Sequence, residues 1–304
     1  MSIQLFLADK FLRLTMKRRM AREPDILSLR AVMNEMAPAK VPAHVRLENT
    51  TLGGVAAERM ATTTAIADRA ILYIHGGGFV GGSPATHRAL TWRLADKTAT
   101  TVYAIDYRLA PEHPFPAALD DCVAAYAALL EAGYSSENLS MGGDSAGGNL
   151  ALATCLKLRA LRMPQPASLF CLSPVTDLAG ETESRKTNRR TDAMFDVRGF
   201  DTVVGRYCPN HDPADPLVSP LRGEVTGFPP TLFHCSRDEL LRDDSVLMSQ
   251  KLSAAGVDVE LEIWPKVFHV WHIAADTIPE SRSAIENVVR FVNGRWSGEK
   301  RLAA

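Results

Sequence analysis

The sequence has no long hydrophobic run and almost no excess of either charge. None of its apolar stretches approaches the roughly 20 residues that a transmembrane helix needs. The 34 basic and 35 acidic side chains give a formal net charge of -1, which offers no electrostatic reason to expect nucleic acid as a partner. With 304 residues, 46% of them hydrophobic, the chain is long enough to bury a sizeable core in one large or two small domains.

Cysteine is also scarce. The five cysteines are far apart, odd in number and without a C-x-x-C pair, which argues against a disulfide framework and against a zinc site. They are Cys122, Cys155, Cys171, Cys208 and Cys235. The apolar N-terminal stretch is broken by Asp9 and Lys10, and no small-residue cleavage site follows, so it does not resemble a secretory signal. We therefore expect a cytoplasmic protein that binds no metal.

Short apolar runs alternate with helical patterns along most of the chain. The expected strands are residues 70–74, 101–105, 139–142, 168–172, 231–235 and 257–264, preceded by an antiparallel pair at 44–52 and 55–61. Apolar stripes with a helical period appear over residues 119–130 and 285–296. This alternation predicts an α/β fold whose sheet is mostly parallel and flanked by helices.

Two segments depart from the alternation. The N-terminal segment places Ile3, Phe6, Leu7, Phe11 and Leu14 on one helical face, which we expect to pack on the protein itself, although a membrane-surface or partner-binding helix is the alternative. A polar insertion at residues 178–222, with a helix near 199–207, is expected to form a cap together with that segment. The predicted organisation is cap helices at 1–45, a catalytic domain at 46–177 and 223–304, and a cap insertion at 178–222.

Residues 143–147, Gly-Asp-Ser-Ala-Gly, match the pattern G-x-S-x-G. The match follows an expected strand and opens an expected helix, the context in which a serine sits on a sharp turn with its hydroxyl exposed at the carboxyl edge of the sheet. Such a turn requires neighbours without bulk, because adjacent backbone segments come close. We expect Ser145 to be a nucleophile; an incidental serine in a structural turn is the alternative.

A run of glycines follows the strand at 70–74. The run, residues 75–78, reads His-Gly-Gly-Gly and matches neither of the common nucleotide-binding spacings. Three successive glycines let backbone N–H groups turn towards one point, as a developing oxyanion requires. We expect this loop, with the N–H of Ala146, to form an oxyanion hole; a loop without a catalytic part is the alternative.

A serine at its ordinary pKa is a weak nucleophile and needs a base. Most of the eight histidines lie in unsuitable segments, such as His234 inside an apolar strand, where a core role is expected. His269 follows the strand at 257–264 in a loop at a carboxyl strand end, and His272 lies three residues further on. We expect His269 to be the base, with His272 as the alternative.

The third catalytic group should be a carboxylate that precedes the histidine in the chain and follows a strand. Asp238 lies three residues beyond the strand at 231–235 and is the expected acid. Glu239 is adjacent, and Asp243 and Asp244 stand where the next helix begins; these three are also candidates.

With these motifs in place, the sequence resembles the hormone-sensitive-lipase-like branch of the α/β-hydrolases. The string DYRLAPEHPFPA at residues 106–117 and the segment DELLRD at 238–243 are similar to family segments, and the resemblance runs from about residue 70 to the C-terminus. The resemblance implies an eight-stranded sheet, a helical cap and hydrolysis of short-chain carboxylesters without a cofactor, and it makes a homodimer possible. It also implies that Gly77, Gly78 and Ala146 supply the oxyanion donors, on a loop shaped by Gly76 and His75. The string His-Val-Trp at 269–271 replaces the frequent His-Gly-Phe and resembles the subgroup that includes monoterpene lactone hydrolases.

The expected function is therefore a serine carboxylesterase acting on short- to medium-chain acyl esters, with a small-molecule ester as its partner. Lactone or amide hydrolysis would use the same machinery and is the alternative. A non-catalytic small-molecule receptor on the same fold is a further possibility, which the filled triad positions Ser145, Asp238 and His269 disfavour. Asp144 and the 106–117 string are expected to hold loops through hydrogen bonds.

Overall fold

The computed structural model describes residues 1–20, 30, 33, 39–180 and 182–296, and it contains an eight-stranded sheet in the order β1-β2-β4-β3-β5-β6-β7-β8. The strands are β1 (Val45–Leu52), β2 (Val55–Thr62), β3 (Ala70–Ile74), β4 (Thr101–Ile105), β5 (Leu139–Asp144), β6 (Ser168–Leu172), β7 (Thr231–Ser236) and β8 (Val259–Trp264). Only the β1–β2 and β2–β4 pairs are antiparallel. The remaining pairs are parallel, so the prediction of a mostly parallel sheet is confirmed. Each strand expected from the sequence is present in the sheet.

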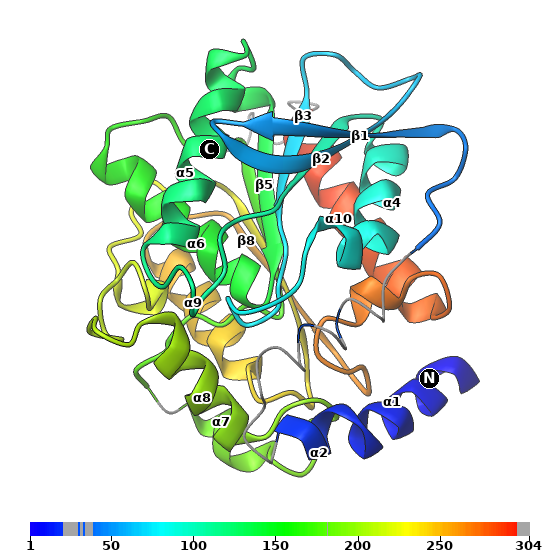
Figure 1. Ribbon diagram of the computed structural model, residues 1–304, viewed down its shortest axis with the longest axis vertical. Helices are drawn as coiled ribbons and strands as arrows, with labels where there is room; N and C mark the ends of the chain where they lie inside the picture. Colours follow the sequence, from blue (N-terminus) through cyan, green and yellow to red (C-terminus); the bar gives the residue numbers. More distant parts are fainter. Residues whose placement is uncertain (21–29, 31–32, 34–38, 181, 297–304) are drawn as a thin grey trace.

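Helices cover both faces of this sheet (Figure 1). The helices are α1 (Ile3–Leu14), α2 (Met16–Met20), α4 (Arg88–Thr98), α5 (Ala117–Glu131), α6 (Ala146–Ala160), α7 (Glu183–Thr187), α8 (Val197–Tyr207), α9 (Arg242–Ala254) and α10 (Pro279–Trp296). Helices α5, α6 and α9 pack on one face, and α4 and α10 pack on the other. Strands buried on both faces explain the continuous apolar runs of the sequence.

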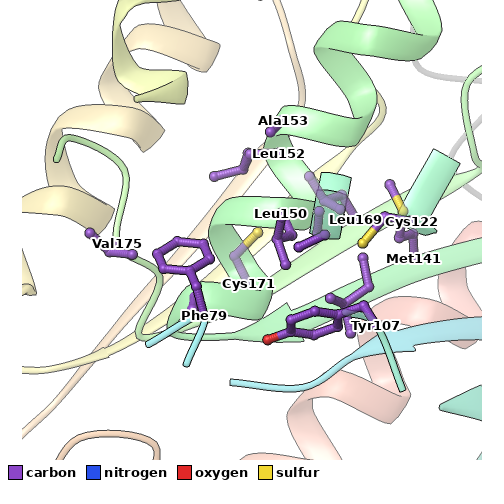
Figure 2. Close-up of a cluster of buried hydrophobic side chains, with 14 of the residues drawn as sticks. Phe79, Tyr107, Cys122, Met141, Leu150, Leu152, Ala153, Leu169, Cys171 and Val175 are labelled. Atoms are coloured by element: carbon purple, nitrogen blue, oxygen red, sulfur yellow. The ribbon is translucent and has the colours of Figure 1, made fainter. Parts of the chain in front are cut away.

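The core on one face is built around α6, the helix that begins directly after Ser145 (Figure 2). Leu150 of this helix lies among Met141, Leu169 and Cys171 from the neighbouring strands, and all four side chains are fully buried. Dense packing of this kind resists displacement of the helix. The first turn of α6, and with it the position of Ser145, is therefore fixed by the core.

Helices α1, α2, α7 and α8 lie together at one end of the molecule, beyond the carboxyl ends of the parallel strands (Figure 1). The ammonium of Lys17 donates to the carbonyl oxygens of Arg189 and Asp192 at 2.6 and 2.7 Å. The guanidinium of Arg13 donates to the carbonyl oxygens of Arg190 and Asp192 at 3.0 and 3.1 Å. The N-terminal segment and the insertion therefore contact each other through charged side chains and backbone.

Helix α1 packs on the protein, as the sequence predicted, but not through the apolar face that the pattern indicated. The face formed by Ile3, Phe6, Leu7, Phe11 and Leu14 is exposed, and the buried residues of α1 are Leu5 and Leu12 on the other side. Both faces of this helix are apolar, so the period of the pattern alone could not identify the inner one.

The five cysteines are buried and unpaired. Burial raises the pKa of Cys122, Cys155, Cys171, Cys208 and Cys235. Thiols of this kind behave as small apolar side chains rather than nucleophiles. Within the described part of the chain, no helix combines the length and the hydropathy that crossing a membrane would require.

Candidate active site

Ser145 occupies the turn between β5 and α6 in a conformation that side-chain-bearing residues rarely adopt. Its φ and ψ are 51° and -116°. Such a conformation costs on the order of 1–3 kcal/mol and persists only where the surroundings enforce it. Here the amide of Ser145 donates to Leu172 O at 2.9 Å, and its carbonyl accepts from Asn149 N at 3.1 Å. The sequence expectation of a sharp strand-to-helix turn at Ser145 is confirmed.

Two glycines make this turn sterically possible. A Cβ on Gly147 would lie 2.0 Å from the carbonyl oxygen of Ile74, and one on Gly143 would lie 2.5 Å from the same atom. Both obstacles are backbone atoms of a central strand, which cannot move away. The glycines at either end of the G-x-S-x-G pattern therefore allow β3 and the serine turn to approach each other.

The glycine run after β3 forms a loop beside Ser145. Gly77 and Gly78 have φ values of +121° and +64°, where glycine is favoured, and the amides of Val80 and Gly81 donate back to Gly77 O. The ring of His75 stacks on Tyr107 with centroids 4.3 Å apart. Burial, followed by the positive charge of nearby His87, lowers the pKa of His75 to about 3, so this imidazole is neutral.

The carboxylate of Asp144 joins that loop to the serine turn. It accepts hydrogen bonds from Tyr73 Oη at 2.6 Å and from the amide of Gly76 at 2.9 Å, and it lies 3.1 Å from His87 Nε2. A Cβ on Gly76 would lie 2.1 Å from this carboxylate. Asp144 therefore holds the loop by a hydrogen bond, as the sequence led us to expect.

Asp144 and His87 form a buried ion pair. Burial favours the neutral form of each group, yet their mutual attraction outweighs it, so the pKa of Asp144 is lowered and the pKa of His87 is raised. His87 and Tyr73 were not expected at the site, because a histidine at a helix start and a tyrosine inside a strand give no signal in the sequence. Only the sheet register brings Tyr73 beside β5.

His269 is held by a carboxylate, and that carboxylate belongs to Glu239. The Nδ1 atom of His269 lies 2.6 Å from Oε2 of Glu239, and both side chains are almost fully buried. The second oxygen of Glu239 accepts from the amide of Ser236 at 2.8 Å. The ring of Phe195 meets the ring of His269 edge-on at 4.5 Å. With Nδ1 engaged, the free nitrogen of this histidine is Nε2, which has no hydrogen-bond partner among the described residues.

The prediction that Asp238 would hold this histidine is wrong. Asp238 turns the other way, and its carboxylate accepts from the amide of Lys266 at 3.1 Å. The turn after β7 folds Glu239 back beneath the strand end. There its carboxylate accepts a hydrogen bond from the amide of Ser236 and lies against the imidazole of His269. The carboxylates at the start of α9 are engaged elsewhere, Asp243 with the amide of Ser184 and Asp244 with the guanidinium of Arg185.

His272, the second candidate for the base, points away from the site. Its Nε2 lies 3.0 Å from Nδ1 of His234, whose other nitrogen lies 3.3 Å from Glu262. Burial, reinforced by the charges of His234 and His269, lowers the pKa of His272 far below its usual range. Burial likewise lowers the pKa of His234 to about 4. Both are neutral core histidines beneath the loop that carries His269.

Ser145 and His269 line the same cavity, which has a volume of about 450 Å³. The glycine loop contributes residues 76–79, and Ala146 lines the cavity beside Ser145. The opposite wall is apolar and comes from the N-terminal segment and the insertion, the two segments that the sequence predicts to form a cap. It consists of Ala8, Phe11, Leu12, Met16, Met33, Met194, Phe195, Phe200, Val203 and Val204. A largely apolar cavity with a few convergent polar groups is the usual form of a small-molecule site.

Among the described residues that line the cavity, the carboxylates are paired. None of the described residues that line it is lysine or arginine, and its two carboxylates are paired, Asp144 with His87 and Asp276 with Arg93. Among the described residues, no three His, Cys, Asp or Glu side chains converge as a metal site would require. The polar groups near Ser145 therefore include its own hydroxyl, the imidazole of His269 and the backbone amides of the loop and of α6.

Other proteins share this fold and sequence. Residues 71–273 match a family described by its alpha/beta hydrolase fold. An acetyl-hydrolase of Streptomyces hygroscopicus is 43% identical over 224 residues, or 74% of this chain and 75% of that protein. An esterase of Acinetobacter venetianus is 36% identical over 248 residues, or 81% and 82% of the two chains.

Solved structures agree over nearly the whole chain. The crystal structure of EstE5 is 38% identical, covers 98% of this chain and 100% of its own, and superposes with a TM-score of 0.94. A hormone-sensitive lipase from a metagenome library is 37% identical, with coverages of 94% and 97% and a TM-score of 0.88. The expected likeness to monoterpene lactone hydrolases stays a prediction. The chain belongs to the α/β-hydrolase fold family, in the branch that resembles hormone-sensitive lipase.

Proposed function

We propose that this protein is a serine carboxylesterase whose catalytic residues are Ser145, His269 and Glu239. The observation that carries the proposal is a strained serine turn that shares one cavity with a histidine held by a buried carboxylate. A nucleophile, a base and a group that orients the base are the three parts that acyl transfer through an acyl-enzyme requires. Relatives named acetyl-hydrolase and esterase support the reaction type.

In the proposed mechanism, Nε2 of His269 takes the proton of the Ser145 hydroxyl as its oxygen attacks the ester carbonyl. Glu239, hydrogen-bonded to Nδ1, keeps the imidazole in the tautomer that presents a free Nε2 and stabilises the imidazolium that forms. The imidazolium then donates its proton to the departing alcohol, which leaves an acyl group on Ser145. Water activated by the same histidine hydrolyses this acyl-enzyme.

The amides of Gly77, Gly78 and Ala146 are proposed to stabilise the negative charge on the carbonyl oxygen in the tetrahedral intermediates. Ala146 is the first residue of α6, so its amide lies at a helix N-terminus, where negative charge is favoured. The hydrogen bond from Gly76 to Asp144 fixes the loop before substrate arrives. Donors that need no reorganisation during the reaction are the most effective kind of electrostatic catalyst.

The proposed substrates are uncharged esters with short- to medium-chain acyl groups. The apolar cap wall and the absence of lysine and arginine among the described lining residues favour an alkyl chain over a carboxylate or phosphate. A volume of about 450 Å³ accommodates a molecule of modest size.

A series of p-nitrophenyl acyl esters tests the function. The wild-type protein should hydrolyse the shorter members, and Ser145→Ala should lower kcat by about 10⁴-fold or more, because the nucleophile is lost. A circular-dichroism melt of the variant, unchanged from that of the wild type, shows that the loss is chemical. Equal, background-level turnover by the two proteins would refute the esterase function.

A further inference from the structure

Helix α1 carries two apolar faces, and only one of them is used by the fold. Leu5 and Leu12 are buried, at 1% and 5% exposure, whereas Ile3, Leu7 and Leu14 on the opposite side are 77%, 60% and 59% exposed. Phe6 and Phe11 complete the exposed side at 45% and 59%. We call Ile3, Phe6, Leu7, Phe11 and Leu14 the outer stripe.

Exposed large hydrophobic side chains are concentrated in the outer stripe. Among the described residues, the other exposed large hydrophobic side chains are Met1, at the start of the same segment, and four that are far apart in sequence. Those four are Ile66, Leu161, Leu247 and Ile263. Single exposed apolar residues are normal, but a contiguous row on one helix marks a surface that meets something apolar.

Polar contacts at both ends hold α1 so that this stripe faces outwards. At its start, Ser2 donates from its amide and hydroxyl to the two carboxylate oxygens of Glu280, at 2.6 and 2.8 Å. At its end, Arg13 of α1 and Lys17 of the adjoining α2 donate to carbonyl oxygens of residues 189–192. The exposure of the stripe is therefore a consequence of how the helix is attached, not of a loose terminus.

The segment that bears the stripe is strongly basic. Residues 1–20 contain five basic side chains and one acidic side chain, in a protein whose net charge is -1. The single acid, Asp9, is bound by Arg13 at 2.8 Å. Lys10 and Arg18 are exposed, and the ammonium of Lys10 lies 5.5 Å from the ring centre of Phe6. Apolar side chains flanked by exposed positive charges match the composition of helices that lie in the surface of anionic membranes.

The stripe also adjoins the mouth of the cavity. Phe11 both lines the cavity and is 59% exposed, and Ala8, Leu12 and Met16 of the same segment line it as well. An object that covers the outer stripe therefore lies next to the entrance that leads to Ser145.

From this geometry we propose that α1 docks on an anionic lipid surface through its outer stripe and so places the cavity entrance at the lipid–water boundary. A second copy of this chain fits the stripe less well, because two segments of the same positive charge would face each other. The docking does not depend on the proposed esterase function. Only the delivery of an ester from the lipid layer to Ser145 rests on it.

Sedimentation with phospholipid vesicles tests the docking. The vesicles are an equal mixture of phosphatidylcholine and phosphatidylglycerol, with pure phosphatidylcholine for comparison. We expect wild-type protein to bind the mixed vesicles and to be released as the salt concentration rises. The variant Ile3→Gln/Leu7→Gln/Leu14→Gln should bind at least about tenfold more weakly, since it loses three apolar side chains that would otherwise enter the lipid.

Two controls separate the stripe from general surface properties. Ile66→Gln/Leu161→Gln/Leu247→Gln removes three exposed apolar side chains elsewhere and should bind vesicles as the wild type does. Lys10→Gln/Arg18→Gln should weaken binding to the mixed vesicles only. None of the residues changed in these variants lines the cavity, so kcat/KM for soluble p-nitrophenyl acetate should stay within about twofold of the wild-type value.

Ser145→Ala protein keeps the two proposals distinguishable, because it should bind vesicles normally even though it cannot hydrolyse an ester. Absence of wild-type binding to the mixed vesicles, or equal binding by the stripe variant, would overturn the docking. A wild-type dimer that becomes monomeric in the stripe variant by analytical ultracentrifugation would also overturn it, by assigning the stripe to self-association.

Discussion

The two walls of the cavity are built in opposite ways. The sheet wall, formed by the glycine loop and the turns that carry Ser145 and His269, fixes its side chains through strained and closely packed backbone. Ser145 and Val270 have positive φ, and neighbouring glycines leave no room for a Cβ. Its buried polar groups are joined by hydrogen bonds and ion pairs. The cap wall presents side chains such as Met16 and Val204, on ordinary helices, to the cavity, and its contribution is apolar contact.

This difference indicates that the sheet wall positions the proposed reacting groups, whereas the cap wall influences which substrate binds. Strained backbone persists only where packing enforces it, and that packing gives the reacting groups the precision that acyl transfer needs. An apolar side chain on a helix can change size without moving a catalytic group. We therefore expect changes in the sheet wall to lower kcat by orders of magnitude, and changes in the cap wall to alter the choice of substrate by a few-fold.

The largest effect should come from the two adjacent carboxylates after β7. Glu239→Gln removes the charge that orients His269 and stabilises its imidazolium, so kcat should fall by about 10³–10⁴-fold. Asp238→Asn is the matched control, because it changes the preceding residue, whose carboxylate binds the amide of Lys266 and not His269. It should keep kcat within about threefold of the wild-type value. Steady-state kinetics with p-nitrophenyl acetate measure both, and a larger loss in Asp238→Asn would assign the catalytic acid to Asp238.

An intermediate effect is expected at Asp144, which fixes the glycine loop without touching the reacting atoms. Asp144→Asn keeps the size of the side chain but loses the ion pair with His87. We expect kcat to fall by about 10–100-fold with little change in KM, because the proposed oxyanion donors of the loop become less well placed. Asp121→Asn is the control, because it breaks an ion pair with Arg108 and neither residue lines the cavity. It should lower the melting temperature and leave kcat unchanged; equal kcat losses in both variants would reduce Asp144 to a general structural role.

The smallest effect should come from the cap wall. Val204→Phe adds volume at a half-buried residue that lines the cavity. We expect kcat/KM to fall several-fold for the longest p-nitrophenyl esters and by less than about twofold for the acetate, because only the long chains need that space. Uniform losses along the ester series would show that the cap also positions the catalytic groups.

The same contrast explains how much could be predicted from the sequence. The strands β3 to β7 were predictable from continuous apolar runs, since these strands are buried on both faces. The antiparallel pair β1 and β2 was predictable from the Gly53-Gly54 turn that joins the two strands. Ser145 and the glycine loop were predictable because glycine is the only residue that fits where backbone segments touch. His269 was predictable from its place at a carboxyl strand end.

Two predictions failed for reasons that lie beyond local pattern. Asp238 and Glu239 both follow β7, and the choice between them depends on a turn in which Ser236 binds the Glu239 carboxylate. The apolar residues of α1 fall on both faces, and the choice of inner face depends on contacts with Glu280 and residues 189–192, which are distant in sequence. Turn geometry and long-range contacts decide both choices, and these features leave no periodic signal in the sequence.

The most direct test of the Ser145–His269–Glu239 assignment is the rate at which diethyl p-nitrophenyl phosphate phosphorylates the protein, followed by intact mass and peptide mapping. This reagent reports activation of the serine before any deacylation step. We predict one label per chain on Ser145, labelling slowed by about 10³-fold or more in Glu239→Gln, and a rate close to that of the wild type in Asp238→Asn. A label on another residue, or faster labelling of Glu239→Gln than of Asp238→Asn, would contradict the assignment.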